Sequence, residues 1–239
     1  TEAAARHAKK ANTPLIVVFN QLDHDNSNYD STLEQCKTAF GNKTTIVQYP
    51  VDAGPNFSAI IDVLKMKMYT YKDESGKPEI SDIPEAELEK AEELHNELVE
   101  KAAENEEALM ELYFDKGTLT EDEMRKGIKL GMLDLTLYPV FCTTAKKSIG
   151  VGRLMEFITN IAPAPKEKKM TKIISGKEVK MDASEAPSVF VFKTAVEPHV
   201  GEITYFKVMS GVVKEGLDLI NSKTGNKERL SQVFVPDGK

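Results

Sequence analysis

Two short polar segments, far apart in the sequence, each follow a run of apolar residues. Asn-Gln-Leu-Asp at 20–23 comes after the apolar run 15–19, and Thr-Ala-Lys at 144–146 comes soon after the mainly apolar run 135–142. Apolar runs of this length that are rich in β-branched residues are typical of buried parallel strands. Because ligands of α/β proteins bind at the carboxyl ends of such strands, we expect both polar segments at one ligand-binding edge.

The Asn-x-x-Asp spacing of Asn20 and Asp23 is weak evidence by itself. With eleven Asn and thirteen Asp in 239 residues, about 0.6 matches are expected by chance, so the motif needs support from its context. An Asx-rich turn after a strand is the simpler alternative. The second polar segment, which also follows a predicted strand, favours a ligand site over a simple turn.

The chemistry of the two segments suits guanine. Guanine presents its N1–H and its N2 amino group side by side, and one ionised carboxylate such as that of Asp23 accepts both. Adenine has no such donor pair and would leave the carboxylate unsatisfied. We expect Asn20 to tie its loop to neighbouring segments and to reach the N7 edge of the base, and the backbone N–H of Ala145 to donate to O6.

With these motifs, the chain resembles the elongation factor G family, the translational GTPases of ribosomal translocation. The family's two guanine-reading motifs are usually written N-K-x-D and S-A-K. Further matching segments are 14–17, 56–57, 62–67, 139–145, 163–165, 192–193, 198–201, 206–211 and 227–230. The resemblance implies a GTP- or GDP-binding site formed by Asn20, Gln21, Leu22, Asp23, Thr144, Ala145 and Lys146.

Two of these residues depart from the family pattern. Gln21 stands where the family has Lys, which packs along the nucleotide face. Its absence removes a cation near a π system, an effect on the order of 0.5–2 kcal/mol. Thr144 stands in place of Ser and keeps the hydroxyl group. The change at Gln21 predicts weaker GTP binding or altered turnover, even in the full-length protein.

The chain contains no G-x-x-x-x-G-K-[ST] motif, since Gly-Lys at 76–77, 176–177 and 238–239 is never followed by Ser or Thr. In GTPases that loop cradles the phosphates and helps to place Mg²⁺. We therefore expect a segment of a longer GTPase, in which Mg²⁺ binds outside this chain, and no GTP hydrolysis by the segment alone. No catalytic residue and no metal ligand is assigned: the four His lack metal-ligand spacing, and two Cys cannot form a structural zinc site.

The acidic character of the chain is local. Its net charge is −7, yet residues 85–111 hold eleven acidic and two basic residues, a charge of −9 that leaves +2 for the remainder. Apolar residues recur there at helical spacing, which predicts one or two acidic amphipathic helices that begin near Pro84. Such a run is usually a solvated helix face, and the alternative is a docking surface for a basic partner.

Periodicity and turn residues predict the remaining elements. Helices are expected at 2–10, 30–40 and 151–161, and after a capping box formed by Thr120 and Glu123. Strands are expected at 46–49 and 65–71, with a turn at 73–78. Beyond the Lys-rich stretch 166–182, the apolar period falls to about two, which predicts strands at 188–196, 202–210, 217–221 and 229–234.

These elements predict an α/β nucleotide-binding sheet, an inserted α+β subdomain and a partial β-barrel. The resemblance implies that the sheet is a partial P-loop-GTPase-type α/β sheet that lacks its N-terminal half. By resemblance to the family, the parts of the G domain are 1–44 and 135–165, and the inserted G′ subdomain is 45–134. A linker is expected at 166–186 and a truncated domain II barrel at 187–239.

The resemblance implies a ribosomal translocation factor whose partners are ribosomal RNA and the ribosomal stalk protein. The G′ subdomain would contact the stalk protein, and domain II would face RNA of the small subunit. Six basic residues of domain II are compatible with phosphate contacts, namely Lys193, Lys207, Lys214, Lys223, Lys227 and Arg229. The alternative is a paralogous ribosome-binding or ribosome-protection factor with weak or dispensable GTP turnover.

The sequence also predicts where the protein resides. No apolar run approaches the ~18 residues of a membrane span, so no membrane partner is expected. Cys36 and Cys142 lie far apart, which favours a reducing compartment without a disulfide framework. Together with the resemblance, these features predict a cytoplasmic and monomeric segment.

Overall fold

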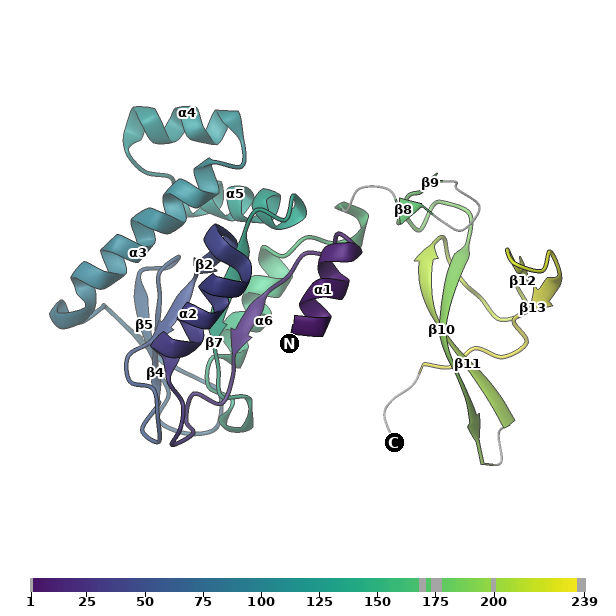
Figure 1. Ribbon diagram of the computed structural model, residues 1–239, viewed down its shortest axis with the longest axis horizontal. Coiled ribbons are helices and arrows are strands. Elements are labelled where there is room, and N and C mark those ends of the chain that lie inside the picture. The colour runs from purple at the N-terminus through teal and green to yellow at the C-terminus, as the bar shows by residue number, and fades with distance from the viewer. Residues whose placement is uncertain (1, 168–170, 173–177, 199–200, 236–239) are drawn as a thin grey trace. The chain divides into compact units, whose positions relative to one another are not determined.

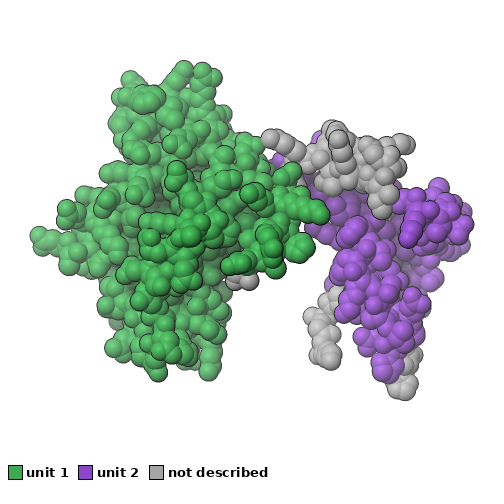
Figure 2. Space-filling model, in the orientation of Figure 1, with its two compact units in different colours: residues 1–163 green, residues 164–239 purple. Residues whose placement is uncertain are grey.

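The computed structural model describes residues 2–167, 171–172, 178–198 and 201–235. The chain divides into two compact units, Thr1–Pro163 and Ala164–Lys239, called unit 1 and unit 2 (Figure 2). Figure 1 labels the helices and strands of both units. The parts of the predicted linker at 168–170 and 173–177 lie outside the described residues.

A three-stranded parallel sheet in unit 1 carries both polar segments. Its strands are β1 (Val17–Phe19), β7 (Tyr138–Cys142) and β2 (Thr44–Ile46), in the order β1-β7-β2. All five residues of β7 are buried, as expected of a central strand in a parallel sheet. The strands predicted at 15–19 and 135–142 are confirmed, each with a later start.

Helices α2 and α6 pack on opposite faces of this sheet. The helices of this part of unit 1 are α1 (Glu2–Lys10), α2 (Tyr29–Phe40) and α6 (Val151–Asn160) (Figure 1). Phe19 of β1 contacts Tyr29 of α2 with ring centroids 5.7 Å apart, and Phe141 of β7 contacts Phe157 of α6 at 4.7 Å. Phe19 pairs in register with Cys142, and because side chains alternate along a strand, Phe19 and Phe141 point to opposite faces.

A four-stranded antiparallel sheet, called the inserted sheet, lies in the chain between β2 and β7. Its strands are β3 (Gln48–Pro50), β4 (Ala59–Asp62), β5 (Lys67–Thr70) and β6 (Glu79–Ser81), in that order. The single strand predicted at 46–49 is wrong, since Ile46 ends β2 and Gln48 begins β3. Val47 joins the two sheets: its N–H donates to the carbonyl of Val140 at 3.2 Å, and its carbonyl accepts from the N–H of Val63 at 3.0 Å.

Three helices follow the inserted sheet: α3 (Glu85–Ala103), α4 (Glu107–Lys116) and α5 (Glu121–Leu133). The predicted capping box is confirmed, since Thr120 accepts from the N–H of Glu123 while the Glu123 side chain accepts from the N–H of Thr120. Helices α3 and α5 approach closely at Gly127, where a Cβ would lie 2.3 Å from the carbonyl oxygen of Ala102. Most acidic side chains of 85–111 are exposed, while the opposite side of α3 is buried.

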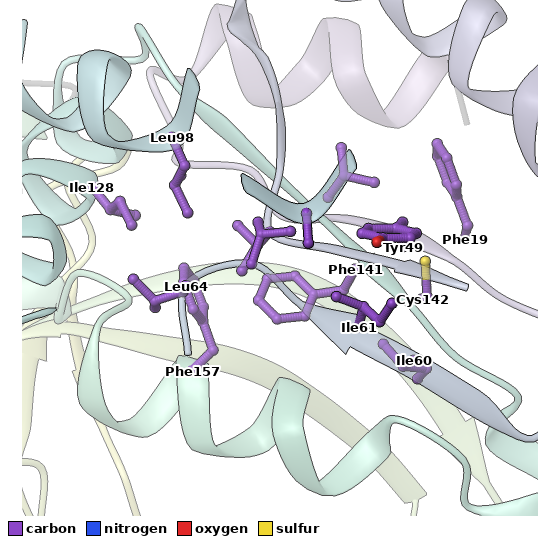
Figure 3. Packing of buried hydrophobic residues seen from close by; sticks show 14 of the residues in the cluster. Phe19, Tyr49, Ile60, Ile61, Leu64, Leu98, Ile128, Phe141, Cys142 and Phe157 are labelled. Carbon is purple, nitrogen blue, oxygen red and sulfur yellow. The ribbon is translucent and has the colours of Figure 1, made fainter. Parts of the chain in front are cut away.

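One hydrophobic core connects the parallel sheet, the inserted sheet and the helices of unit 1. Figure 3 shows Phe141 of β7 at its centre, between side chains of the inserted sheet and Phe157 of α6. Phe141 and Ile61 are completely buried.

Three short 3-10 turns complete the described helical segments: Gly41–Lys43, Ala145–Lys147 and Pro165–Glu167. No helix in the described ranges is long and apolar enough to cross a membrane.

In its described residues, unit 2 contains three antiparallel strand pairs. They are β8 (Thr171–Lys172) with β9 (Glu178–Val179), β10 (Ser188–Glu197) with β11 (Gly201–Ser210), and β12 (Asp218–Ile220) with β13 (Lys227–Arg229). The strands predicted at 188–196, 202–210 and 217–221 are confirmed. The strand predicted at 229–234 is wrong, because β13 ends at Arg229, where its three-residue pairing with β12 ends.

Candidate functional site

The two polar segments leave the parallel sheet side by side. Phe19, the last residue of β1, pairs in register with Cys142, the last residue of β7. The N–H of Thr143 then donates to the carbonyl of Phe19 at 2.9 Å, which extends the parallel pairing by one bond. We call the chain at 20–23 and 143–147, where both strands end, the site edge.

Asn20 ties the two halves of the site edge together. Its Oδ1 accepts from the Thr143 hydroxyl at 3.1 Å and from the backbone N–H of Ala145 at 3.0 Å. The amide of Ala145, which is expected to donate to guanine O6, therefore already has a partner within the chain. A base whose O6 accepts from this N–H has to share it with Oδ1 of Asn20 or displace that oxygen.

Asp23 faces the second half of the site edge and is held by two of its side chains. One carboxylate oxygen accepts from the Thr144 hydroxyl at 3.1 Å, and the other lies 3.0 Å from Nζ of Lys147. The hydrogen bond from Lys147 is the main reason that the pKa of Asp23 lies below its ordinary value. Asp23 is therefore ionised at neutral pH. Each of its oxygens has one partner here, and a carboxylate oxygen can accept two hydrogen bonds.

The other predicted site residues have different surroundings. Gln21 is exposed and has a φ of +62°, a backbone conformation that is uncommon outside glycine. Leu22 is 4% exposed and belongs to the core, while its carbonyl accepts from the Ser27 hydroxyl and the N–H of Gly54. Lys146 is exposed in the 3-10 turn. Leu22 thus anchors the loop in the hydrophobic core, whereas Gln21 and Lys146 face solvent.

Two residues of the site edge are absent from the sequence-based assignment. Thr143 binds Asn20, and Lys147 pairs with Asp23. The run Thr-Thr-Ala-Lys-Lys at 143–147 contains both, but which Lys turns back toward Asp23 depends on the 3-10 turn over Ala145–Lys147. The spacing of residues in a motif does not predict which Lys side chain this turn directs toward Asp23.

A groove adjoins the site edge along β1. It has a volume of about 940 Å³ and is lined by Asn20 and Gln21 together with residues of β1, α1 and α2. Arg6 and Lys9 of α1 contribute positive charge to its wall. Within the described ranges, no group of three or more His, Cys, Asp or Glu could hold a metal ion.

Comparison with known proteins finds relatives along nearly the whole chain, although not among the family models. No family model matches the chain. Elongation factor G of Ureaplasma parvum serovar 3 is 32% identical over 238 residues, which cover 98% of this chain and 35% of that protein. A solved crystal structure from Thermus thermophilus matches with a TM-score of 0.81 and 27% identity, over 100% of this chain and 33% of that one. The chain thus spans about a third of the length of these relatives.

Proposed function

Since this chain belongs to the elongation factor G family, we propose that its site edge is the guanine-recognition part of a translational GTPase. The register of β1 and β7, which places Asn20 and Asp23 against residues 143–147, is the observation that carries the proposal. In the whole protein, the bound nucleotide would be GTP or GDP. GTP hydrolysis would be coupled to movement on the ribosome.

The proposed contacts follow from the spare acceptor capacity of Asp23. Its two oxygens each hold one partner, Thr144 or Lys147, and each retains a lone pair for N1–H or the N2 amino group of guanine. Two charge-assisted hydrogen bonds of this kind would favour guanine over adenine, which offers no such donor pair. Asn20 would keep the two halves of the site edge in register.

The nucleotide phosphates and Mg²⁺ would be held outside this chain. The residues of the site edge suit the base, since they offer a carboxylate, an amide side chain and backbone N–H groups. The chain has no Gly-rich phosphate loop of the Walker type. This division supports a guanine half-site rather than a complete catalytic centre.

The domain assignment implied by the family is part of the same proposal. We assign 1–44 and 135–165 to the G domain, 45–134 to the inserted G′ subdomain, 166–186 to a linker and 187–239 to the first part of a domain II barrel. The boundary at 44 falls inside β2, whose Thr44 and Thr45 both pair with β7. The exposed Phe190 and Phe192 of β10, which are 56% and 60% exposed, support a barrel that continues beyond these strands.

Ribosomal partners are part of the same proposal. The exposed acidic residues of α3 and α4 would face the ribosomal stalk protein, and the basic residues of unit 2 would face ribosomal RNA. Two of those basic side chains already have partners, since Lys227 lies 2.9 Å from Asp218 and Lys193 lies over the Tyr205 ring. Cys36 and Cys142 are both free and buried, which agrees with a cytoplasmic location.

A second candidate function rests on Gln21. Its exposed side chain replaces the Lys that the family places along the nucleotide, so nucleotide turnover would be weaker. Gln21 therefore favours a paralogous factor that binds or protects the ribosome and needs little GTP turnover.

The test of the guanine site is the substitution Asp23→Asn in the full-length protein. Asn offers an N–H₂ donor and one acceptor, which suits the 2-carbonyl of xanthine and not the 2-amino group of guanine. We expect the affinity for GDP to fall about a hundredfold or more and the affinity for xanthosine diphosphate to rise. Fluorescence titration with labelled nucleotides measures both.

The matched control is Asp25→Asn, which removes the same charge from an exposed position of the same loop. We expect its affinities for both nucleotides to stay within about twofold of the wild type. Retention of full guanine selectivity by Asp23→Asn would contradict the role given to Asp23. Equal losses in both variants would point to net charge rather than to base recognition.

A further inference from the structure

The second half of the site edge belongs to a closed loop formed by residues 144–149. Thr144 and Ile149 exchange both backbone hydrogen bonds, at 3.0 and 3.1 Å. Between them lies the 3-10 turn that carries Ala145 and Lys147, and the turn ends at Ser148 with a φ of +59°. The direction of the Ala145 N–H and the place of the Lys147 side chain therefore depend on the backbone of this loop.

The turn between β5 and β6 of the inserted sheet packs against the closed loop. Gly76, in this turn, has a φ of +75°, and a Cβ there would lie 3.1 Å from Cβ of Ser148 and 3.4 Å from its carbonyl oxygen. Such a distance is shorter than a normal carbon–carbon contact of about 3.5–4.0 Å. The backbone at Gly76 thus contacts the closed loop at its left-handed residue.

The end of the closed loop also rests on the inserted sheet. Gly150 has a φ of +75°, and a Cβ there would lie 2.2 Å from the carbonyl oxygen of Cys142 and 2.9 Å from Cδ1 of Ile60 in β4. Only glycine fits between the end of β7 and the inserted sheet. Helix α6 begins directly after this residue.

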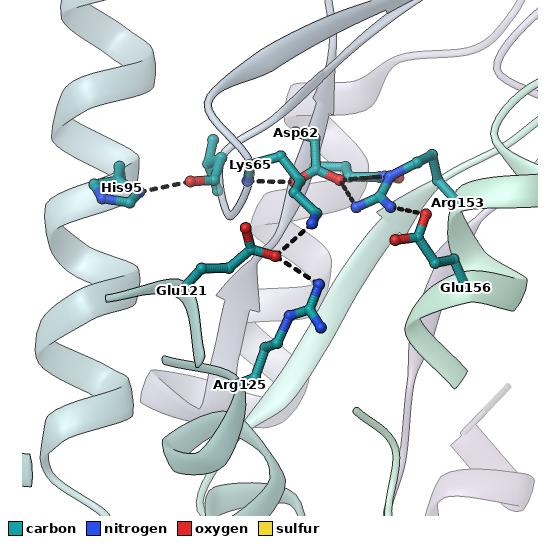
Figure 4. A network of polar contacts seen from close by, with 9 residues as sticks. Asp62, Lys65, His95, Glu121, Arg125, Arg153 and Glu156 are labelled. Carbon is teal, nitrogen blue, oxygen red and sulfur yellow. Dashed lines mark hydrogen bonds and ion pairs between the residues drawn. The ribbon is translucent and has the colours of Figure 1, made fainter. Parts of the chain in front are cut away.

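A buried ion pair fixes helix α6 to the inserted sheet. Nε and a terminal nitrogen of Arg153 lie 3.1 and 2.7 Å from Oδ2 of Asp62, which ends β4 and is completely buried (Figure 4). Asp62 also accepts from Nε2 of Gln48 at 3.1 Å and from the N–H of Lys65 at 2.9 Å. The guanidinium of Arg153 lies 5.1 Å from the Tyr69 ring of β5.

We infer that the inserted sheet sets the geometry of the guanine site through two positioning residues. These are Gly76, in the turn between β5 and β6, and Arg153 of α6, which binds Asp62 of the inserted sheet. This inference rests on the proposed function of the site edge and names what holds its second half in place. Ile60, Asp62, Gly76, Gly150 and Arg153 form what we call the brace. None of them lies in the site edge, but together they hold the left-handed residue of the closed loop and the chain that directly follows the loop, so a shift of the brace would misdirect Ala145 and Lys147.

The test is Gly76→Ala in the full-length protein, with Gly117→Ala as the matched control. Both glycines lie in the insertion and have similar φ values of +75° and +72°, so Ala strains the backbone at both. A Cβ at Gly76 meets Ser148, whereas a Cβ at Gly117 has nothing within 4 Å. The pair of variants therefore separates the contact with the closed loop from backbone strain.

We expect Gly76→Ala to weaken GDP binding about tenfold and Gly117→Ala to leave it within about twofold of the wild type. Without nucleotide, we expect hydrogen exchange at the amides of Lys147, Ser148 and Ile149 to be faster in Gly76→Ala only. Equal GDP affinities in the two variants, together with equal exchange rates, would overturn the inference.

The exchange measurement keeps the two proposals apart. If the wild-type protein shows no guanine selectivity, the proposed function fails, and faster exchange in Gly76→Ala alone still demonstrates the brace. If the wild type selects guanine and Gly76→Ala matches Gly117→Ala in both measurements, the proposed function stands and the brace is wrong.

Discussion

The site edge and the brace adjoin each other in unit 1, yet their polar groups are held in opposite ways. The side chains of Asp23 and Lys147 are 18% and 35% exposed, and their ion pair borders solvent. The side chains of Asp62 and Arg153 are 0% and 9% exposed, and Asp62 has four hydrogen-bond donors around it. The ion pair of the site edge can thus exchange its partners with water or with the proposed nucleotide, whereas the buried ion pair of the brace keeps its partners.

This difference predicts a division of effects. Loss of a buried charge's partner is costly, because the remaining charge stays desolvated and unpaired. Loss of a partner that borders solvent lowers the free energy of unfolding only slightly, because water replaces it. Substitutions in the buried ion pair of the brace should therefore lower the stability of the fold, and substitutions in the site edge should change binding of the proposed ligand at nearly constant stability.

The largest expected effect is that of Arg153→Ala. The substitution leaves the buried carboxylate of Asp62 without its guanidinium, so we expect the free energy of unfolding to fall by about 3–5 kcal/mol. Urea unfolding followed by circular dichroism measures the loss. The double variant Asp62→Asn with Arg153→Ala should recover part of it, because the unpaired charge is then gone.

The control for Arg153→Ala is Lys72→Ala. Lys72 and Glu79 form a shorter contact of 2.6 Å, but their side chains are 69% and 65% exposed. We expect this variant to lose less than about 1 kcal/mol. Similar losses for Arg153→Ala and Lys72→Ala would break the contrast between the brace and exposed ion pairs.

A middle-sized effect is expected from Gln21→Lys in the site edge. A Lys at this exposed position would place a cation beside the proposed nucleotide site, so we expect GDP binding to become more favourable by about 0.5–2 kcal/mol. The free energy of unfolding should change by less than about 0.5 kcal/mol, because no buried contact is altered. Nucleotide titration and urea unfolding measure the two quantities.

Asn96→Lys serves as its control, because it adds the same charge at an exposed position of α3. We expect no change of GDP affinity beyond about twofold in this variant. An unchanged affinity in Gln21→Lys as well would show that Gln21 does not weaken the site. It would also remove the support for a factor with dispensable turnover.

The site edge could largely be predicted from the sequence, because its signals are local. An apolar run followed by Asn20 and Asp23, and another followed by Thr144 and Ala145, are visible within short windows. The register of the two strands has no local signal, since the paired residues Phe19 and Cys142 are far apart in the chain. The rule that ligands bind at the carboxyl ends of parallel strands indicated that the two segments meet, and the resemblance to a family supported it.

The brace could not be predicted, because its parts look unlike their structural roles. Strand β4 ends in Asp62, and a charged residue argues against a buried strand until its partner Arg153 is known, 91 positions away. Gly76 has the sequence context of an ordinary turn glycine, and its contact with Ser148 depends on the packing of the inserted sheet. The strand predicted at 46–49 failed for a related reason, since Val47 bonds to both sheets.

The smallest expected effect concerns the ion pair of the site edge. Lys147→Met removes the main cause of the lowered pKa of Asp23, so we expect that pKa to rise toward its ordinary value of about 3.9. A carboxyl whose pKa is lowered in the folded state stabilises the fold above the unfolded-state pKa, and this stabilisation is lost as pH falls through the folded-state pKa. Carbon-detected NMR titration of Asp23 measures the shift directly.

The stability of Lys147→Met should therefore differ from that of the wild type by less than about 1 kcal/mol at pH 7, and the difference should shrink as the pH falls below about 4. The control is Lys146→Met, an adjacent and exposed Lys of the same turn, which should leave the pKa of Asp23 nearly unchanged. Equal pKa shifts in both variants would assign the effect to general charge. A stability loss as large as that of Arg153→Ala would place Asp23 and Lys147 in the brace rather than in an edge that exchanges partners.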